Sequence, residues 1–316
     1  MTRAVPELAI GDHARSDTLP EPAFSTAVTT GLQEYGFIVL SDHGIAPALL
    51  DAAYLQCQRL FALDTLVKNR YCGGLRGYTP FGMEHAKDSR HADLKEFWQI
   101  GRERPPDSHG AGQANLWPDE LPEFQAVFVE LFGALDAIAR LVLRALTPAL
   151  AVPPDYFESI ACEGNSILRL IHYPPVPTNA DPQALRSAPH EDINLLTVLV
   201  AARGAGLELR DRDGSWLPVA TEQRNLIVDS GDMLARLTND VIPATTHRVV
   251  NPVGPNVSRY SMRFFLHPTD ATELDCLPSC LGVGPKYPPI TAGEFLAQRV
   301  REIGLASDDT DAAEPS

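Results

Sequence analysis

The chain has 316 residues, of which 44% are hydrophobic and 21% are charged, so we expect a folded protein with a sizeable core. The formal net charge of -15 argues against proteins that bind nucleic-acid phosphates or anionic membranes, because both need a basic surface. The five cysteines are scattered, and no signal peptide or long apolar span is visible, which favours free thiols in a cytoplasmic protein.

The first half of the chain predicts helices separated by short strands and loops. In the first helix, Phe24, Val28 and Leu32 recur every fourth residue, which places them on one face. A long helix from Pro122 to about Leu146 carries a continuous apolar stripe, which is typical of a scaffold helix behind a sheet. The other segments expected here are an edge strand at 5–10, a helix at 23–35, a buried strand and turn at 36–44, a helix at 47–61 and an irregular loop at 73–82.

From residue 166 on, short apolar runs alternate with residues that favour turns, a pattern typical of an antiparallel barrel or sandwich. Asp213 and Gly214 form a hairpin-turn dipeptide between two of these runs. Beyond them, Thr291 and Glu294 fit a capping box, which predicts a helix to about Ile303 and then a disordered acidic tail. The expected strands are 166–173, 193–200, 206–209, 216–219, 226–229, 247–250 and 260–266.

These textures divide the chain into three parts. We expect a helical and mixed region at 1–160, a β-rich core at 161–270 and an extension at 271–316 that contains one helix and the tail. No internal repeat and no clean interdomain linker is visible in the sequence. The helical first half is therefore expected to fold directly against the β core.

The stretch "SAPHEDINLLTVLV", at 187–200, is a mostly apolar run whose front edge carries a histidine and two acids. Residues two apart on a strand point to the same side, so His190 and Asp192 would face one way and Glu191 the other. An imidazole and a carboxylate side by side supply two ligands of a metal site. A third ligand is then expected from a histidine downstream.

Two downstream histidines are candidates for the third ligand. His247 lies where a β-like run begins, whereas His267 is better explained as a polar residue at a strand end. A second His-x-Asp pair, His91 and Asp93, lies in a charged stretch without strand character and is not expected to bind metal. Two histidines and one carboxylate leave the opposite positions of a metal open, which suits non-haem Fe(II) and O₂, although zinc accepts the same ligands.

A second constellation follows in "SRYSMRFFLHP". Arg259 and Ser261 are two apart on an expected strand, so a guanidinium fork and a hydroxyl would share one face. This combination is suited to binding a carboxylate. Tyr173, in "RLIHYPPVP", offers a phenol as a further donor to the same group.

These constellations resemble the isopenicillin-N-synthase-like branch of the 2-oxoglutarate- and Fe(II)-dependent dioxygenases. The resemblance extends to "YPP" at 173–175, "GDMLARLTND" at 231–240 and "HRVVNP" at 247–252. In the first half, "EYGFIVLSDHGI", "DLKEFWQIG" and "NLWP" are similar to that family's helical region. The resemblance covers most of the chain, from about Val5 to about Pro268. It implies a mainly β fold with flanking helices and a double-stranded β-helix, or jelly-roll, as the core.

The resemblance also implies the roles of individual residues. Arg263 stands where the family frequently has proline, and it shares the face of Arg259 and Ser261, so it would alter the charge of the pocket. Arg169 shares a face with Tyr173 and either meets an anionic substrate or forms an ion pair at the rim of the barrel. The implied site residues are His190, Asp192 and His247 for iron, and Arg259, Ser261 and Tyr173 for the far carboxylate of 2-oxoglutarate.

The implied activity is oxidation of a small-molecule metabolite by Fe(II), with 2-oxoglutarate and O₂ as cosubstrates and succinate and CO₂ as products. Hydroxylation, desaturation and ring closure are all compatible with the resemblance. Two alternatives stay open: an Fe(II) oxidase of the same fold that does not use 2-oxoglutarate, and a non-catalytic β-barrel that binds metal or a small ligand. No nucleic-acid or membrane partner is expected, and a monomer is favoured.

Overall fold

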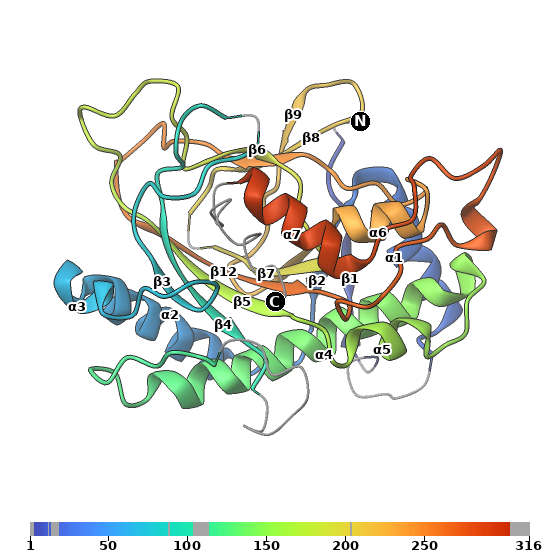
Figure 1. Ribbon diagram of the computed structural model, residues 1–316, viewed down its shortest axis with the longest axis horizontal. Helices are drawn as coiled ribbons and strands as arrows, with labels where there is room; N and C mark the ends of the chain where they lie inside the picture. Colours follow the sequence, from blue (N-terminus) through green and yellow to red (C-terminus); the bar gives the residue numbers. More distant parts are fainter. Residues whose placement is uncertain are drawn as a thin grey trace, which may run out of the picture.

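The computed structural model describes residues 3–11, 13, 19–87, 89–103, 114–202 and 204–303, and its strands are flanked by helices (Figure 1). The strands are β1 (Glu7–Ala9), β2 (Phe37–Ser41), β3 (Gly77–Thr79), β4 (Glu96–Gly101), β5 (Ile167–Tyr173), β6 (Ser187–His190), β7 (Leu196–Val200), β8 (Leu207–Arg210), β9 (Trp216–Pro218), β10 (Leu226–Ser230), β11 (His247–Val249) and β12 (Arg259–Leu266). The helices are α1 (Pro22–Tyr35), α2 (Pro47–Ala62), α3 (Thr65–Asn69), α4 (Phe124–Leu150), α5 (Tyr156–Ala161), α6 (Asp232–Leu237) and α7 (Ala292–Glu302), with a short 3-10 helix at Pro278–Cys280.

The strands of the described residues form two sheets that face each other. The large sheet has eight strands in the order β1-β2-β10-β7-β12-β5-β4-β3, and the small sheet has four in the order β6-β11-β8-β9. A buried apolar cluster joins the two sheets, with Phe37, Val39, Phe97, Ile171, Tyr173, Leu199 and Ile227 from the large sheet and Leu207, Leu209 and Val249 from the small one. The space between the sheets is therefore the interior of a closed β structure.

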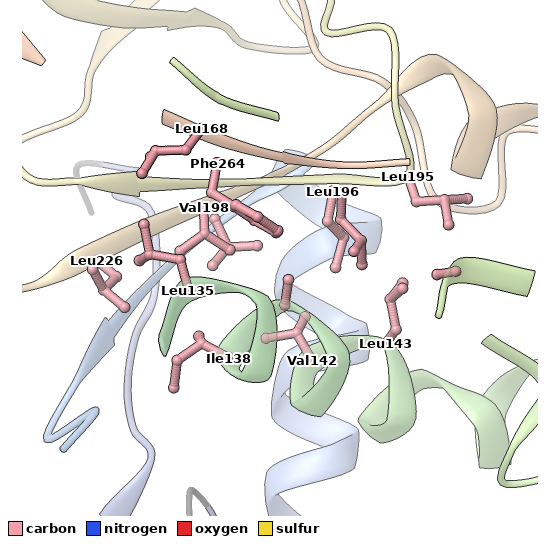
Figure 2. Close-up of a cluster of buried hydrophobic side chains, with 14 of the residues drawn as sticks. Leu135, Ile138, Val142, Leu143, Leu168, Leu195, Leu196, Val198, Leu226 and Phe264 are labelled. Carbon is pink, nitrogen blue, oxygen red and sulfur yellow. The ribbon is translucent and has the colours of Figure 1, made fainter. Parts of the chain in front are cut away.

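The outer face of the large sheet is covered by α4, which runs along it (Figure 1). Leu135 and Val142 of this helix point toward Val198 and Phe264 of the sheet (Figure 2). The sheet is thus buried on both faces. The sequence of a strand buried on both faces is a continuous apolar run rather than an alternation of apolar and polar residues, which explains the apolar run at 196–200.

The chain crosses from the small sheet to the large one between β6 and β7. The expectation that the run at 187–200 places His190 and Asp192 on one strand is therefore wrong, because β6 ends at His190 and β7 begins only at Leu196. Asp192 lies in the irregular crossover, and it does not share a strand face with His190. The register of the small sheet instead places His190 directly opposite His247.

The long helix α4 was expected to end at about Leu146, before its proline. It continues instead through Pro148 to Leu150. Proline lacks the N–H that would bond to the carbonyl of Arg144 one turn earlier. The hydroxyl of Thr147 donates a 2.9 Å hydrogen bond to that carbonyl instead. This local replacement, together with the position of Pro148 in the last turn, explains why the helix is not broken there.

The first half contributes strands as well as helices. Its four strands, β1 to β4, extend the large sheet at both ends, with β2 next to β10 and β4 next to β5. No strand was expected at residues 93–101, but Glu96–Gly101 forms β4. The loop at 73–82, expected to be irregular, contains β3, which pairs with β4. Strands from both sides of residue 160 share one sheet. The division of the chain at this residue stays a prediction.

Several local predictions are confirmed. The segment at 5–10 contains the edge strand β1, and the hairpin between β8 and β9 turns at Gly214, whose φ of 83° is in the left-handed region that glycine tolerates. Thr291 and Glu294 form the expected capping box of α7. All five cysteines are unpaired. The expected acidic tail lies outside the described residues. Among the helices that are described, none is long and apolar enough to cross a bilayer.

Candidate active site

Three side chains from distant parts of the chain converge at the junction of the two sheets. His190 ends β6, His247 begins β11, and Asp192 lies in the crossover after β6. One ligand atom of each lies within 4.8 Å of the others, and no other such trio of His, Cys, Asp or Glu occurs in the described part of the chain. Oδ1 of Asp192 is 3.6 Å from Nε2 of His190 and 3.7 Å from Nε2 of His247.

The hydrogen bonds of the two imidazoles fix which nitrogen faces the site. Nδ1 of His190 donates to the carbonyl of Ala188 at 2.8 Å, and Nδ1 of His247 donates to the carbonyl of Thr245 at 3.1 Å. Burial lowers the pKa of His190 to about 4 and that of His247 to about 3, so both rings are neutral at pH 7. Each Nε2 therefore presents a lone pair to the junction, as a metal ligand must.

The carboxyl of Asp192 is held in its ionised form. Burial opposes ionisation, but His247, Arg263 and a hydrogen bond from the hydroxyl of Thr197 together lower the pKa of Asp192 well below its ordinary value. Asp229 lies beside it, and burial and the charge of Asp192 raise the pKa of Asp229 well above its ordinary value. Asp192 is thus the charged member of this pair, and two neutral imidazoles with one carboxylate fit a divalent metal ion.

A second group of polar side chains lies on the interior face of the large sheet. Arg259 is paired directly opposite Tyr173 across β12 and β5, and Ser261 follows two residues later on the same face. Arg259 is 3% exposed, and the other two side chains are fully buried. Nε and Nη1 of Arg259, the hydroxyl of Ser261 and the phenol of Tyr173 have no hydrogen-bond partner among the described residues. Buried donors without partners are costly, so this cluster fits a carboxylate ligand.

A cavity lies beside His190 and Asp192, and Leu296 and Val300 of α7 line part of it. Arg169 lines it and forms an ion pair with Glu84 at 2.9 Å, so the expected ion pair is present; a contact with an anionic substrate stays a prediction. The same guanidinium donates to Gln99 at 2.9 Å and lies over the ring of Phe97. Further lining residues are Leu75, Lys95, Tyr173, His190, Asp192, Arg263, Phe265, Leu296, Val300 and Ile303.

The sequence interpretation missed a buried charged network next to this cavity. Lys95 forms ion pairs with Glu84 at 2.6 Å and with Asp93 at 2.7 Å. Asp93 also accepts a 2.8 Å hydrogen bond from the backbone N–H of Ala188, which ties the start of β6 to the chain before β4. Alternation gives a signal for Lys95, just before β4, and for Gln99, four residues later on the same side, but Glu84 lies in a loop where no pattern marks it.

The remaining candidates are not members of the trio found among the described residues. Nδ1 of His91 lies 3.6 Å from a carboxylate oxygen of Asp181, and His91 belongs to no metal-ligand trio within the described residues. His267 directly follows the end of β12, and its Nδ1 donates to the carbonyl of Phe265 at 3.2 Å. Glu191 accepts a 3.0 Å hydrogen bond from the hydroxyl of Thr246.

Comparison with known proteins places this geometry in context. The family model of the 2OG-Fe(II) oxygenase superfamily matches residues 164–268, and that of the N-terminal part of non-haem dioxygenases in morphine synthesis matches residues 7–120. A 2-oxoglutarate-Fe(II) type oxidoreductase, hxnY of Emericella nidulans, is 30% identical over 278 residues, which cover 83% of this chain and 79% of that protein.

Solved structures agree with these relatives. The crystal structure of a 2OG-Fe(II) oxygenase family protein from Caulobacter crescentus is 41% identical, with a TM-score of 0.84 over 95% of this chain and 99% of that chain. A full-length protein of Neurospora crassa, solved in complex with alpha-KG and thymine, is 27% identical, with a TM-score of 0.83 over 94% and 96% of the two chains. The predicted jelly-roll core with flanking helices is confirmed, and the chain belongs to the 2OG-Fe(II) oxygenase superfamily.

Proposed function

We propose that the protein is a dioxygenase that uses Fe(II), 2-oxoglutarate and O₂ to oxidise a small-molecule metabolite, with His190, Asp192 and His247 as the iron ligands. The convergence of these three side chains within 4.8 Å carries the proposal. Two neutral imidazoles and one carboxylate are the ligand types of non-haem Fe(II) oxygenases, and they leave positions free for other ligands. When bound, Fe(II) supplies the chemistry by which O₂ converts 2-oxoglutarate to succinate and CO₂ and oxidises the substrate.

The unpartnered donors in the interior form the proposed cosubstrate site. Arg259 binds the far carboxylate of 2-oxoglutarate through its guanidinium, and Ser261 and Tyr173 donate their hydroxyls to the same group. These three residues are buried and already face one another across β12 and β5, so little ordering is needed on binding. Their task is to hold and orient the keto acid and to exclude water from it.

The cavity beside the iron ligands is the proposed substrate site. Arg169 lines it, but its guanidinium is bound by Glu84 and Gln99, so its proposed contribution to the site is shape and packing rather than a free charge. Phe265 adds an apolar wall. The position of a substrate C–H bond against the iron ligands decides between hydroxylation and desaturation.

A succinate assay tests this function against its alternatives. The protein is loaded with Fe(II) under argon, mixed with 2-oxoglutarate and a panel of small metabolites, and exposed to O₂. Succinate formation that requires both Fe(II) and 2-oxoglutarate is the expected result. Iron-dependent O₂ consumption without succinate would instead identify an oxidase. If the protein binds iron but neither forms succinate nor consumes O₂, only the non-catalytic binding protein remains.

The proposal includes a cytoplasmic, monomeric protein. Five unpaired cysteines favour a reducing compartment, since thiols in oxidising compartments usually form disulfides. Cell fractionation tests the location, and light scattering on the purified full chain tests the monomer. Recovery of the native protein from an oxidising compartment, or a stable dimer in solution, would contradict these two points.

A further inference from the structure

Arg263 is a buried cation at the edge of the proposed iron site. It is 4% exposed and lines the cavity, and it lies on β12 two residues beyond Ser261 on the same face. Its Nε and Nη2 have no hydrogen-bond partner among the described residues. Its Nη1 is 3.5 Å from Nε2 of His247, which is too long for a strong hydrogen bond.

The other cations that line this cavity already have partners. Arg169 is bound by Glu84 and Gln99, and Lys95 forms its two ion pairs with Glu84 and Asp93. A buried guanidinium without partners is costly, because its desolvation is not offset by hydrogen bonds. Arg263 is thus the cavity cation, among the described lining residues, that still has donors to offer.

The neighbouring acids offset part of the charge of Arg263 without satisfying its donors. Asp192 and Asp229 both act on it electrostatically. Neither accepts a hydrogen bond from it within the part of the chain that the structure describes. Asp192 is moreover assigned to the iron. The donors of Arg263 therefore remain free for a ligand that enters the cavity.

A planar guanidinium favours a planar anion that can accept two hydrogen bonds, and a carboxylate is the commonest such group. The cavity lining offers apolar surface at Ile171 and Phe265, while Arg169, which is paired opposite Arg263 across β12 and β5, is already held by Glu84 and Gln99. A ligand that fits both features has an apolar body and one carboxylate.

We propose that Arg263 binds a carboxylate of the organic substrate, so that the enzyme oxidises small carboxylic acids with an apolar body; this inference rests on the function proposed above. The cosubstrate is a poorer match for Arg263. Arg263 lines the cavity beside the iron ligands, whereas Arg259 and Ser261 do not. A keto acid whose far carboxylate is held by Arg259 and Ser261 therefore leaves the cavity side of Arg263 to a second molecule.

Matched acids and amides test the proposal. The probes are phenylacetate, cyclohexanecarboxylate and hexanoate, each paired with its primary amide, which has the same shape but no charge. Binding to the Fe(II) and 2-oxoglutarate complex is measured under argon by calorimetry, and succinate release is measured after O₂ is added. At least one acid should bind about tenfold or more tightly than its amide, because a buried charge-assisted hydrogen bond contributes that much.

Variants then locate the preference. Arg263→Gln should bring the acid and its amide within about threefold of each other, and Arg263→Lys should keep part of the preference because it keeps the charge but not the fork. Both should bind 2-oxoglutarate as the wild type does. The control, Arg140→Gln, removes a guanidinium of α4 that is paired with Asp136 and Glu158, and it should change none of these values.

Three results would overturn the assignment of Arg263. One is a wild-type protein that binds no acid more tightly than its amide, and another is an acid preference that survives in both Arg263 variants. The third is a loss of 2-oxoglutarate affinity in these variants, which would assign Arg263 to the cosubstrate. Failure of the proposed function would be visible earlier, as a wild-type protein that binds no 2-oxoglutarate before any acid is added.

Discussion

Replacement of Arg259 by methionine should separate cosubstrate binding from folding. Methionine keeps an unbranched side chain but has no guanidinium. Arg259 is 3% exposed, and its Nε and Nη1 have no partner among the described residues. A buried charge of this kind destabilises the protein without its ligand, so Arg259→Met should leave the free energy of unfolding unchanged or raise it by about 1 kcal/mol.

The same substitution should weaken the binding of 2-oxoglutarate, and by more than it changes the free energy of unfolding. The variant loses a buried, charge-assisted pair with the far carboxylate, which costs about 3 kcal/mol and raises the Kd roughly a hundredfold. Ser261 and Tyr173 remain to bind the same carboxylate, so residual binding is expected. Iron affinity should not change, because Arg259 is not one of the three residues that converge as metal ligands.

Anaerobic calorimetry with Mn(II) in place of Fe(II) gives the 2-oxoglutarate affinity, and urea unfolding of the metal-free protein gives the stability. The matched control is Arg248→Met, which removes a guanidinium of β11 that pairs with Glu208 at 2.7 Å and lies over the ring of Trp216. An Arg259→Met protein that binds 2-oxoglutarate within about threefold of the wild type would refute the proposed role of Arg259.

Three further predictions test the iron site, the charged network and the core. Asp192→Ala removes the only carboxylate of the trio, so metal analysis of this variant should find no bound iron. The control Asp181→Ala should keep its iron. A normal iron content in Asp192→Ala would contradict the proposed iron site. Glu84 has its pKa lowered from 4.5 to about 2 because the cations beside it outweigh the effect of burial, so its ionised form stabilises the fold above about pH 4.5 and this stabilisation is lost as the pH falls toward 2. In urea unfolding at pH 7, the free energy of unfolding of the wild type should exceed that of Glu84→Gln by on the order of 3 kcal/mol. This difference should shrink as the pH falls, and a difference independent of pH would refute the reasoning. Leu135→Ala should lower the free energy of unfolding by about 3 kcal/mol, because Leu135 is fully buried against the sheet, while iron affinity is kept; a loss of iron would argue that the site depends on this helix.

The sequence predicted the identity of the converging residues better than their local structure. His190, Asp192 and His247 could be chosen because ligand types and strand context restrict the choice. The reason given for the first two was wrong, since Asp192 lies in the crossover between sheets rather than on the strand of His190. Strand alternation describes only local geometry, whereas the pairing of β6 with β11 that brings the histidines together is non-local.

The remaining misses have non-local causes with one exception, the end of α4. Two charged residues, Lys95 just before β4 and Glu96 at its first position, are tolerated there only because distant partners satisfy them, such as Lys68, which lies 2.8 Å from Glu96. Pro148 predicted a helix end because the hydroxyl of Thr147 was not considered as a substitute donor. Glu84 could not be predicted at all, since no periodic pattern marks a loop residue that meets Arg169 and Lys95 in space.

A crystal structure grown under argon with Mn(II) and 2-oxoglutarate is the most direct test of the account, because anomalous scattering locates the metal. We expect a single metal peak bonded to Nε2 of His190, Nε2 of His247 and a carboxylate oxygen of Asp192, with the far carboxylate of 2-oxoglutarate against Arg259. A metal bound elsewhere, or a keto acid that lies away from Arg259, would contradict the central claim.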